Sequence, residues 1–118
     1  MIKNNWLWML GVVGLVGCGV SNQDDAVEQA ARASCAIYDR CGEVGSGKDY
    51  ADEKDCLTNQ RAFWNNHWSV NDCDDRVNSD AFDFCVSAIK ATSCDNFVDD
   101  LLTRYDKCSE DKVCSGKK

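Results

Sequence analysis

The stretch CAIYDRCG, residues 35–42, combines the two features that decide the fold of this chain, a helical period and closely spaced cysteines. From Val27 to the first of these cysteines, small and apolar residues recur at three- and four-residue steps, which predicts an amphipathic helix over residues 24–40. Arg40 suits the negative C-terminal end of this helix, and Gly42 ends it. The stretch therefore predicts a helix with one cysteine near its C-terminal end and a second cysteine directly after it.

Nine cysteines occur in the 118 residues, and they are expected to supply much of the stability. One of them, Cys18, belongs to an N-terminal motif described below. The other eight are Cys35, Cys41, Cys56, Cys73, Cys85, Cys94, Cys108 and Cys114. An even number of cysteines in an exported domain of this size predicts structural disulfides, here four. Eight cysteines allow roughly a hundred connectivities, and the sequence does not choose among them.

Aliphatic burial alone is expected to be too weak to hold the fold. Residues 19–118 contain only 17 Leu, Ile, Val and Phe residues, a share below the roughly 20% at which a highly charged chain tends to stay disordered. Four disulfides at about 2 to 4 kcal/mol each compensate for this. Metal or redox chemistry is a weaker interpretation of the cysteines, because no C-x-x-C pair of the kind used by zinc ribbons and thioredoxin-like sites occurs.

The rest of the chain predicts three further helices and no strand, because no run alternates with period 2 and no proline occurs. Their expected ranges are 50–68, 79–91 and 95–107, with connectors at 42–49 and 69–79 and a frayed tail at 109–118 that Cys114 holds. Ser79 is the expected N-cap of the third helix. The inward side chains of the last two helices are expected to be Phe82, Cys85, Ile89, Phe97 or Val98, Leu101, Leu102, Tyr105 and Cys108. The predicted fold class is all-α, a small four-helix domain cross-linked by about four disulfides.

The second predicted helix carries the aromatic residues Phe63, Trp64 and Trp68. In a chain so poor in aliphatic residues, the tryptophans are needed for burial, so a core position is the first interpretation. If one tryptophan is exposed instead, it would form a stacking platform for a sugar ring or a peptide. Trp64 and Trp68 are therefore the candidate binding residues.

The motif LVGC, residues 15–18, ends a short apolar N-terminal segment and has the form of a lipoprotein signal. Lys3 provides a positive start, and residues 6–16 are apolar or glycine throughout. This run is too short to span a membrane, which takes about 20 apolar residues. The alternative is an ordinary secretory signal in which the cysteine is incidental. The lipoprotein interpretation predicts removal of residues 1–17, acylation of Cys18, a tether over 18–23 and a disulfide-rich helical domain over 24–118.

The lipoprotein motif and the cysteine spacing together resemble a family of small cysteine-rich bacterial lipoproteins of unknown function, of the type found in myxobacteria. The resemblance rests on Cys35-x5-Cys41-Gly42, Cys56, a Trp-containing helix, Cys73, Cys85, Cys94 and Cys108-x5-Cys114. Some members are loosely associated with natural-product biosynthesis. The resemblance implies disulfides and a place in the cell envelope, lipid-anchored on the periplasmic or surface face of a Gram-negative outer membrane, and it carries over no catalytic residue. Gly19 agrees with the outer membrane, since Asp at that position is the usual signal for retention at the inner membrane.

Charge and motif content disfavour several function classes. The formal net charge of −7 argues against nucleic acid, whose phosphates require a basic surface. The single histidine, His67, has no nucleophile beside it in a recognisable motif, so an enzyme is not expected. Asp72 and Asp74 are followed by Arg76 where a calcium loop of the EF-hand type needs an oxygen ligand. No metal or cofactor is predicted.

These observations lead to a non-enzymatic, envelope-anchored lipoprotein that acts as a binding or structural module. Its predicted partners are the membrane, through the lipid on Cys18, and an envelope protein or glycan. The alternative is a saposin-like carrier of an apolar ligand, although the chain has more cysteines than saposins and few aliphatic residues to line a pocket. A hydrolase or redox enzyme is the third hypothesis.

Overall fold

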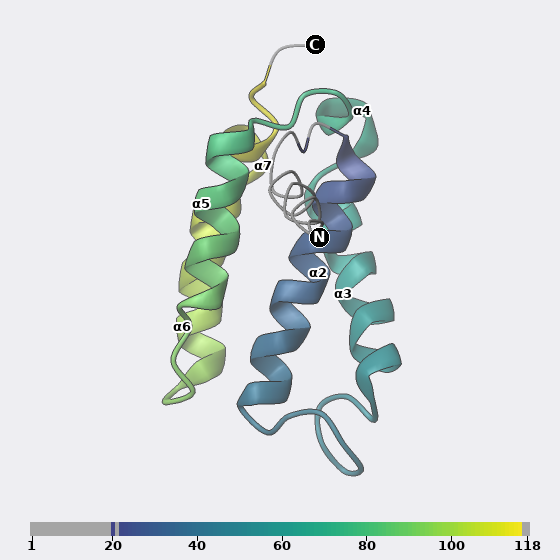
Figure 1. The fold of residues 1–118 in the computed structure, drawn as a ribbon, viewed down its shortest axis with the longest axis vertical. Helices are drawn as coiled ribbons and strands as arrows, with labels where there is room; N and C mark the ends of the chain where they lie inside the picture. Colours follow the sequence, from purple (N-terminus) through teal and green to yellow (C-terminus); the bar gives the residue numbers. More distant parts are fainter. Residues whose placement is uncertain (1–19, 21, 117–118) are drawn as a thin grey trace, which may run out of the picture.

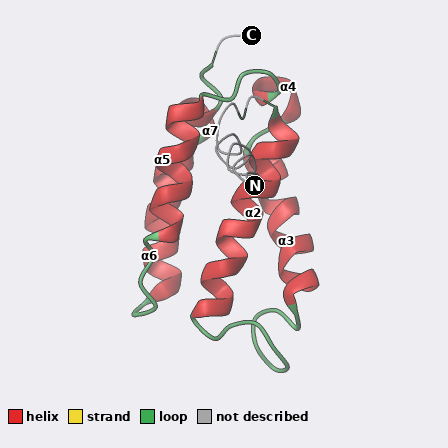
Figure 2. Ribbon diagram, viewed as in Figure 1, coloured by secondary structure: helices red, strands yellow, loops and turns green. Residues whose placement is uncertain are grey.

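The computed structural model describes residue 20 and residues 22–116, and in this part of the chain the regular structure is helical (Figures 1 and 2). The elements are α2 (Gln23–Arg40), α3 (Glu53–His67), α4 (Val70–Cys73), α5 (Ser79–Lys90), α6 (Phe97–Arg104), the 3-10 turn η1 (Tyr105–Cys108) and α7 (Glu110–Val113). Strand-like pairing among the described residues amounts to one isolated bridge between Val44 and Tyr50. The predicted all-α class is confirmed, and residues 22–116 contain four helices of eight residues or more.

The helices form two hairpins that lie side by side. In the first hairpin α2 packs along α3, and in the second α5 packs against α6, η1 and α7. The hairpins meet where α2 contacts α5, as the ribbon shows (Figure 1). Helices α4 and α7 lie at one end of the molecule, which we call the α4–α7 end (Figure 1). Val20 lies there too, because its carbonyl accepts a hydrogen bond from Ser79 at the start of α5. Residues 41–52 and 91–96 lie at the opposite end, the loop end.

Side-chain caps explain where three of the helices begin. Asn22, Asp52 and Asn78 each accept a hydrogen bond from the backbone N–H three residues further on, at 3.0, 2.8 and 3.1 Å. The second helix therefore starts at Glu53 and not at residue 50. The prediction of Ser79 as the third N-cap is wrong by one residue, because the amide oxygen of Asn78 takes that role. Each such cap contributes about 1 kcal/mol.

The C-terminal part differs from the expected long helix and frayed tail. The helix expected over 95–107 is α6 followed by the tighter η1 turn. The tail is folded: Val113 is buried, its carbonyl accepts from Asn78 N at 2.7 Å, and Gly116 N donates to the Arg76 carbonyl at 2.7 Å. These two backbone hydrogen bonds hold the tail against the connector between α4 and α5.

The core lies between the two hairpins and is built from large aromatic and small side chains. Trp64, Trp68 and Phe82 are at most 1% exposed and fill the space that the scarce aliphatic residues leave. Small alanines of α2, such as Ala30, allow the neighbouring helices to approach closely. Phe82, Cys85, Ile89, Leu101 and Cys108 are buried as predicted, and Tyr105 is half-buried.

The prediction that Leu102 points inward is wrong. Its side chain is 59% exposed, whereas Leu101 is 2% exposed. Neighbouring residues on a helix are separated by about 100° of rotation, so a short helix that buries one of them turns the other outward. Leu102 therefore adds to the exposed surface of α6.

The folded domain begins before residue 24. Val20 is 6% exposed, and its carbonyl accepts a hydrogen bond from the Ser79 hydroxyl at 3.4 Å. Gln23 is 1% exposed, and its Nε2 donates to the Trp68 carbonyl at 2.6 Å and to Asn65 Oδ1 at 2.8 Å. Val20 and Gln23, two residues of the expected tether over 18–23, are thus part of the packed structure. The predicted signal segment and Cys18 lie outside the described residues, and no described helix has the length and apolar character that a membrane span requires.

Candidate functional site

The eight cysteines from Cys35 to Cys114 pair among themselves. The four bridges are Cys35–Cys56, Cys41–Cys94, Cys73–Cys114 and Cys85–Cys108. Their Cα–Cα distances run from 4.6 to 5.9 Å, within the usual range for disulfides. The predicted framework of four disulfides is confirmed, and the fold decides the connectivity that the sequence left open.

Two of the bridges lie within hairpins and two lie between them. Cys35–Cys56 ties α2 to α3, and Cys85–Cys108 ties α5 to η1. Cys73–Cys114 joins the hairpins at the α4–α7 end, and Cys41–Cys94 joins them at the loop end. Each hairpin is therefore closed internally and fastened to the other at both ends.

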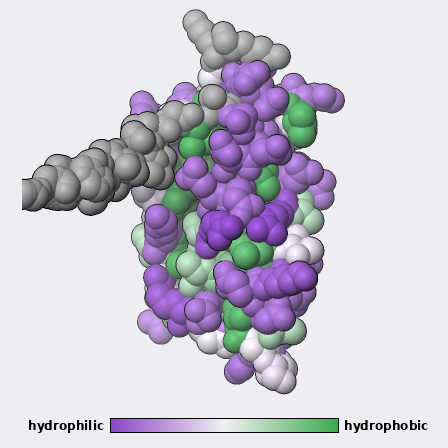
Figure 3. Space-filling model, turned by 45° about the vertical axis from the view of Figure 1, so that its right-hand side comes forward, coloured by the Kyte–Doolittle hydropathy of each residue, from purple (hydrophilic) through white to green (hydrophobic). Residues whose placement is uncertain are grey.

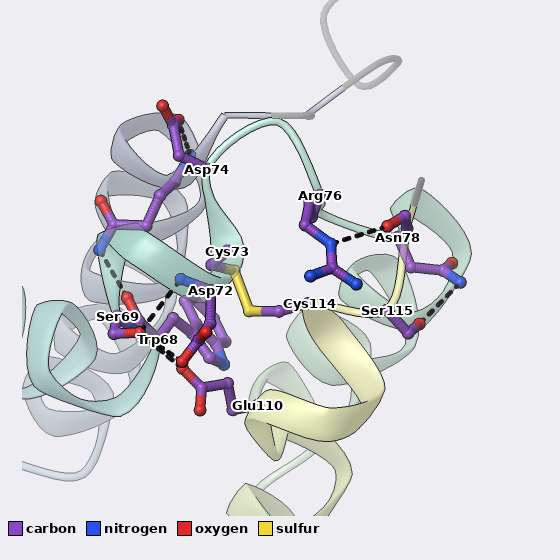
Figure 4. The surroundings of a disulfide bond; sticks show 12 residues. Trp68, Ser69, Asp72, Cys73, Asp74, Arg76, Asn78, Glu110, Cys114 and Ser115 are labelled. Atoms are coloured by element: carbon purple, nitrogen blue, oxygen red, sulfur yellow. Dashed lines mark hydrogen bonds between the residues drawn. A yellow bond between two sulfur atoms is a disulfide. The ribbon is translucent and has the colours of Figure 1, made fainter. Parts of the chain in front are cut away.

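Polar contacts surround the bridge at the α4–α7 end (Figure 4). The Glu110 carboxylate accepts from Ser69 N at 2.9 Å and from the Ser69 hydroxyl at 3.1 Å. On the other side of the bridge, Asn78 Nδ2 donates to the Ser115 hydroxyl at 3.2 Å. These contacts fix α7 against α4 and the start of α5, so this end is a rigid part of the domain.

The tryptophans are core residues, so the first interpretation is confirmed, and the alternative of an exposed binding platform at Trp64 or Trp68 does not apply. Both side chains are 0% exposed, and their ring centroids are 4.6 Å apart. Trp64 Nε1 donates to the Ser34 hydroxyl at 3.3 Å, and Trp68 Nε1 donates to the Cys108 carbonyl at 2.8 Å. A ring with no exposed surface and a satisfied N–H has nothing to offer to a ligand.

The aromatic residue that does reach the surface from this set is Phe63. It is 39% exposed, stacks on the His67 ring at 5.5 Å and lies 5.3 Å from the Tyr105 ring. His67 Nε2 lies 3.1 Å from the Cys108 carbonyl, so this nitrogen is engaged by the backbone of η1. His67 therefore packs and hydrogen-bonds as a structural residue at the edge of the core.

Tyr38 and Tyr105 are held in their neutral form. Burial raises the pKa of Tyr105 to about 12, although its hydrogen bond to the Ser34 hydroxyl opposes this shift. Burial, together with the neighbouring Tyr50, raises the pKa of Tyr38 well above its usual range. Neither phenol is suited to proton transfer near neutral pH.

The surface carries shallow grooves beside α5. One of them has a volume of about 450 Å³ and runs between α5 and the α6–η1 segment, where Phe84, Ala88, Arg104 and Lys107 line it. Phe84 is 59% exposed, and Lys107 Nζ lies 5.9 Å from its ring centroid. An exposed aromatic ring beside a cation can contact a partner by stacking and by hydrogen bonding, so this groove is the candidate binding surface.

Other surfaces offer less to a ligand. The face that comes forward in Figure 3 is mostly hydrophilic, with hydrophobic side chains in scattered places. On the first hairpin, Glu28 bridges Arg32 and Arg61 at 2.8 and 2.7 Å, and the hydrogen bond from Arg61 lowers the pKa of Glu28. Within residues 20 and 22–116, no three His, Cys, Asp or Glu side chains gather in a way that could hold a metal ion.

Sequence reasoning missed the groove because its lining comes from two helices that meet only in the folded state. Phe84 was the available signal, since it lies on the third predicted helix one residue before the inward Cys85. An aromatic residue outside the apolar stripe of a helix indicates an exposed position. The inward stripe alone could therefore have identified Phe84 as a surface residue.

Comparison with known proteins identifies a family for this chain but no matching individual protein. No curated protein and no solved structure matches it. The model of one family matches residues 35–116, a range that starts at the first paired cysteine and contains all four disulfides. The chain belongs to this family, which is described as a family of unknown function (DUF6184).

Proposed function

We propose that this protein is a non-enzymatic recognition module that a lipid on Cys18 holds at the membrane of the cell envelope, in a bacterium of the Gram-negative type. The observation that carries the proposal is the complete pairing of the eight other cysteines. None of these eight needs Cys18 as a partner, which agrees with a separate role for this residue in the LVGC motif.

The burial of Val20 supports a definite orientation of the domain relative to the membrane. Val20 is buried and follows Cys18 by two residues. Two extended residues span about 7 Å, so Cys18 has to lie within about this distance of Val20. An acylated Cys18 would therefore place the α4–α7 end against the membrane and turn the loop end away from it. The net charge of −7 disfavours direct adhesion to anionic lipid, so the lipid anchor has to supply the attachment.

The groove between α5 and α6 is the proposed recognition surface. It runs along the second hairpin, so a partner can reach it while the α4–α7 end faces the membrane. The exposed Phe84 ring beside Lys107 and Arg104 suits an envelope protein or a glycan, which such groups contact by stacking and hydrogen bonds. The saposin-like carrier has less support, because Trp64, Trp68 and Phe82 fill the space between the hairpins.

The decisive experiment is the intact mass of the native protein from a membrane fraction, measured with thiol alkylation before and after reduction. We expect loss of residues 1–17, a diacylglyceryl and acyl increment on Cys18, and eight cysteines that alkylate only after reduction. The matched control is Cys18→Ser, which should leave the membrane fraction while its disulfides still form. A mature protein that lacks acylation, or a Cys18→Ser protein that stays in the membrane, would refute the anchor.

Recognition at the groove is tested by placing a photo-crosslinking residue at position 84 of the anchored protein. We expect a specific crosslinked product that weakens in the Lys107→Ala variant. The same probe at position 70, where Val70 is 52% exposed at the α4–α7 end, is the control. Equal crosslinking from both positions would contradict a recognition role for the groove.

A further inference from the structure

We propose that the Cys41–Cys94 bridge is a site of thiol–disulfide exchange, at which an external thiol attacks Cys94. The bridge differs from the other three in its exposure. Cys94 is exposed and Cys41 is half-buried, whereas the six cysteines of the other bridges are between 0% and 7% exposed. Because attack requires the thiolate to reach a sulfur along the S–S axis, exposure selects this bridge among the four.

The geometry of the loop end also distinguishes the two sulfurs of the bridge. Cys94 lies in the connector between α5 and α6, and two residues later Asn96 has a left-handed backbone with a φ of 53°. Cys41 follows directly on α2 and packs against the core. The sulfur of Cys94 is therefore the accessible electrophile, and that of Cys41 is the leaving group.

The exchange is a simple substitution at sulfur. The thiolate of the external thiol forms a bond to Cys94 Sγ, the Cys41–Cys94 bond breaks, and its electron pair leaves on Cys41 Sγ as a thiolate. A second thiol that attacks the mixed disulfide releases Cys94, so that two external thiols become one disulfide and the protein gains two thiols. Arg40 precedes Cys41, and its guanidinium donates to the Thr92 carbonyl across the bridge region.

The surroundings indicate which thiols react. At the same end of the molecule, Glu43, Asp49 and Asp99 line a hollow of about 290 Å³ together with Asn96 and Phe97, which follow Cys94 by two and three residues. Asp95 adds another carboxylate to this end of the molecule, and Arg40 and Lys48 contribute positive charge there. An excess of carboxylates repels an approaching anion, so a cationic or neutral thiol is the favoured reactant over an anionic one.

Opening this bridge changes how the hairpins are joined. Cys35–Cys56 and Cys85–Cys108 keep each hairpin closed, and Cys73–Cys114 still joins them at the α4–α7 end. At the loop end, the contacts that remain include the Arg40–Thr92 hydrogen bond and the packing of Tyr38 on Phe97, whose ring centroids are 5.1 Å apart. Exchange therefore loosens the loop end and leaves the rest of the fold intact.

The test treats the full-length native protein with a graded series of cysteamine and blocks free thiols with one alkylating reagent. Full reduction and a second, mass-distinct reagent then mark the remaining disulfides, and peptide mapping locates both labels. We expect Cys41 and Cys94 to open at least about tenfold faster than the other six, with the cysteamine adduct on Cys94. Another bridge that opens first, or four bridges that open together, would overturn the proposal.

Two controls complete the experiment. In the Cys41→Ala/Cys94→Ala variant, circular dichroism should show retained helix, and the other three bridges should resist the thiol concentration that opens the native bridge. The rate for cysteamine, corrected by its rate with a neutral model disulfide, should exceed the corrected rate for the anionic 2-mercaptoethanesulfonate by roughly threefold or more at low salt. Equal corrected rates would overturn the assigned thiol class.

Discussion

Replacing Trp68 by alanine should strongly lower the free energy of unfolding of the domain. The side chain is 0% exposed, packs on Trp64 at 4.6 Å and lies edge-on to Phe82 at 5.9 Å, so its removal opens a cavity between the two hairpins. Core Trp→Ala changes cost about 3 to 5 kcal/mol. The Cys108 carbonyl loses its indole donor but keeps the His67 contact at 3.1 Å. The mutation therefore adds no large free-energy cost for a buried carbonyl without a hydrogen-bond partner.

The measurement is urea unfolding of the oxidised protein, followed by far-UV circular dichroism because the mutation alters tryptophan fluorescence. A loss of about 3 to 5 kcal/mol takes a large part of the 5 to 15 kcal/mol typical of a domain. Trp68→Phe should cost about 1 to 2 kcal/mol, since the ring still fills part of the site but donates no hydrogen bond.

The matched control is Phe84→Ala, whose side chain is 59% exposed and whose loss should change the unfolding free energy by about 0.5 kcal/mol or less. A Trp68→Ala protein within about 1 kcal/mol of the wild type would refute the core assignment and restore the stacking platform.

Three further predictions follow from particular contacts. Asn78→Ala should cost about 1 kcal/mol in urea unfolding because α5 loses its cap, and Ser79→Ala should cost less; the reverse order would contradict the assigned cap. Arg61 lowers the pKa of Glu28, so this pair adds stability above the ordinary carboxyl pKa of 4.5 that is lost as the pH falls through the lowered value. In Glu28→Gln this small part of the pH dependence should be absent from urea midpoints. The pKa of Tyr105 is raised to about 12, so the stability that its neutral form contributes is complete below pH 10 and is lost as the pH rises through 12. Alkaline titration of tyrosinate absorbance should show one late-ionising group fewer in Tyr105→Phe. An unchanged profile would contradict the burial of this phenol.

The helices and the presence of disulfides could be predicted because both depend on local information. The period of α2 and the spacing of Phe82, Cys85 and Ile89 on α5 are properties of single segments, and the structure agrees with both. Helix boundaries were less accurate where two adjacent residues compete for one cap. Asn78 and Ser79 are both good caps, and the hydrogen bond of Asn78 Nδ2 to Ser115 is among the contacts present only in the folded state.

The candidate site could be predicted only in part. Trp64 and Trp68 were identified as the important aromatic residues, but their burial depends on the packing of α5 and η1 over α3. The groove beside Phe84 needs α6 to fold back along α5, and no segment contains this information by itself. Leu101 and Leu102 show the same limit, since a short helix can bury only one of two neighbours.

Composition, helical period and cysteine number are enough to predict a helical, acidic, disulfide-stabilised domain, because none of the three depends on the fold. Tertiary structure decided which cysteines pair, since a bridge forms only between Cα atoms brought to about 4.4 to 6.8 Å. It also decided that one bridge stays exposed at the loop end while three are buried. Pairing and exposure depend on distances between residues far apart in the chain, and these distances arise only when the two hairpins pack together.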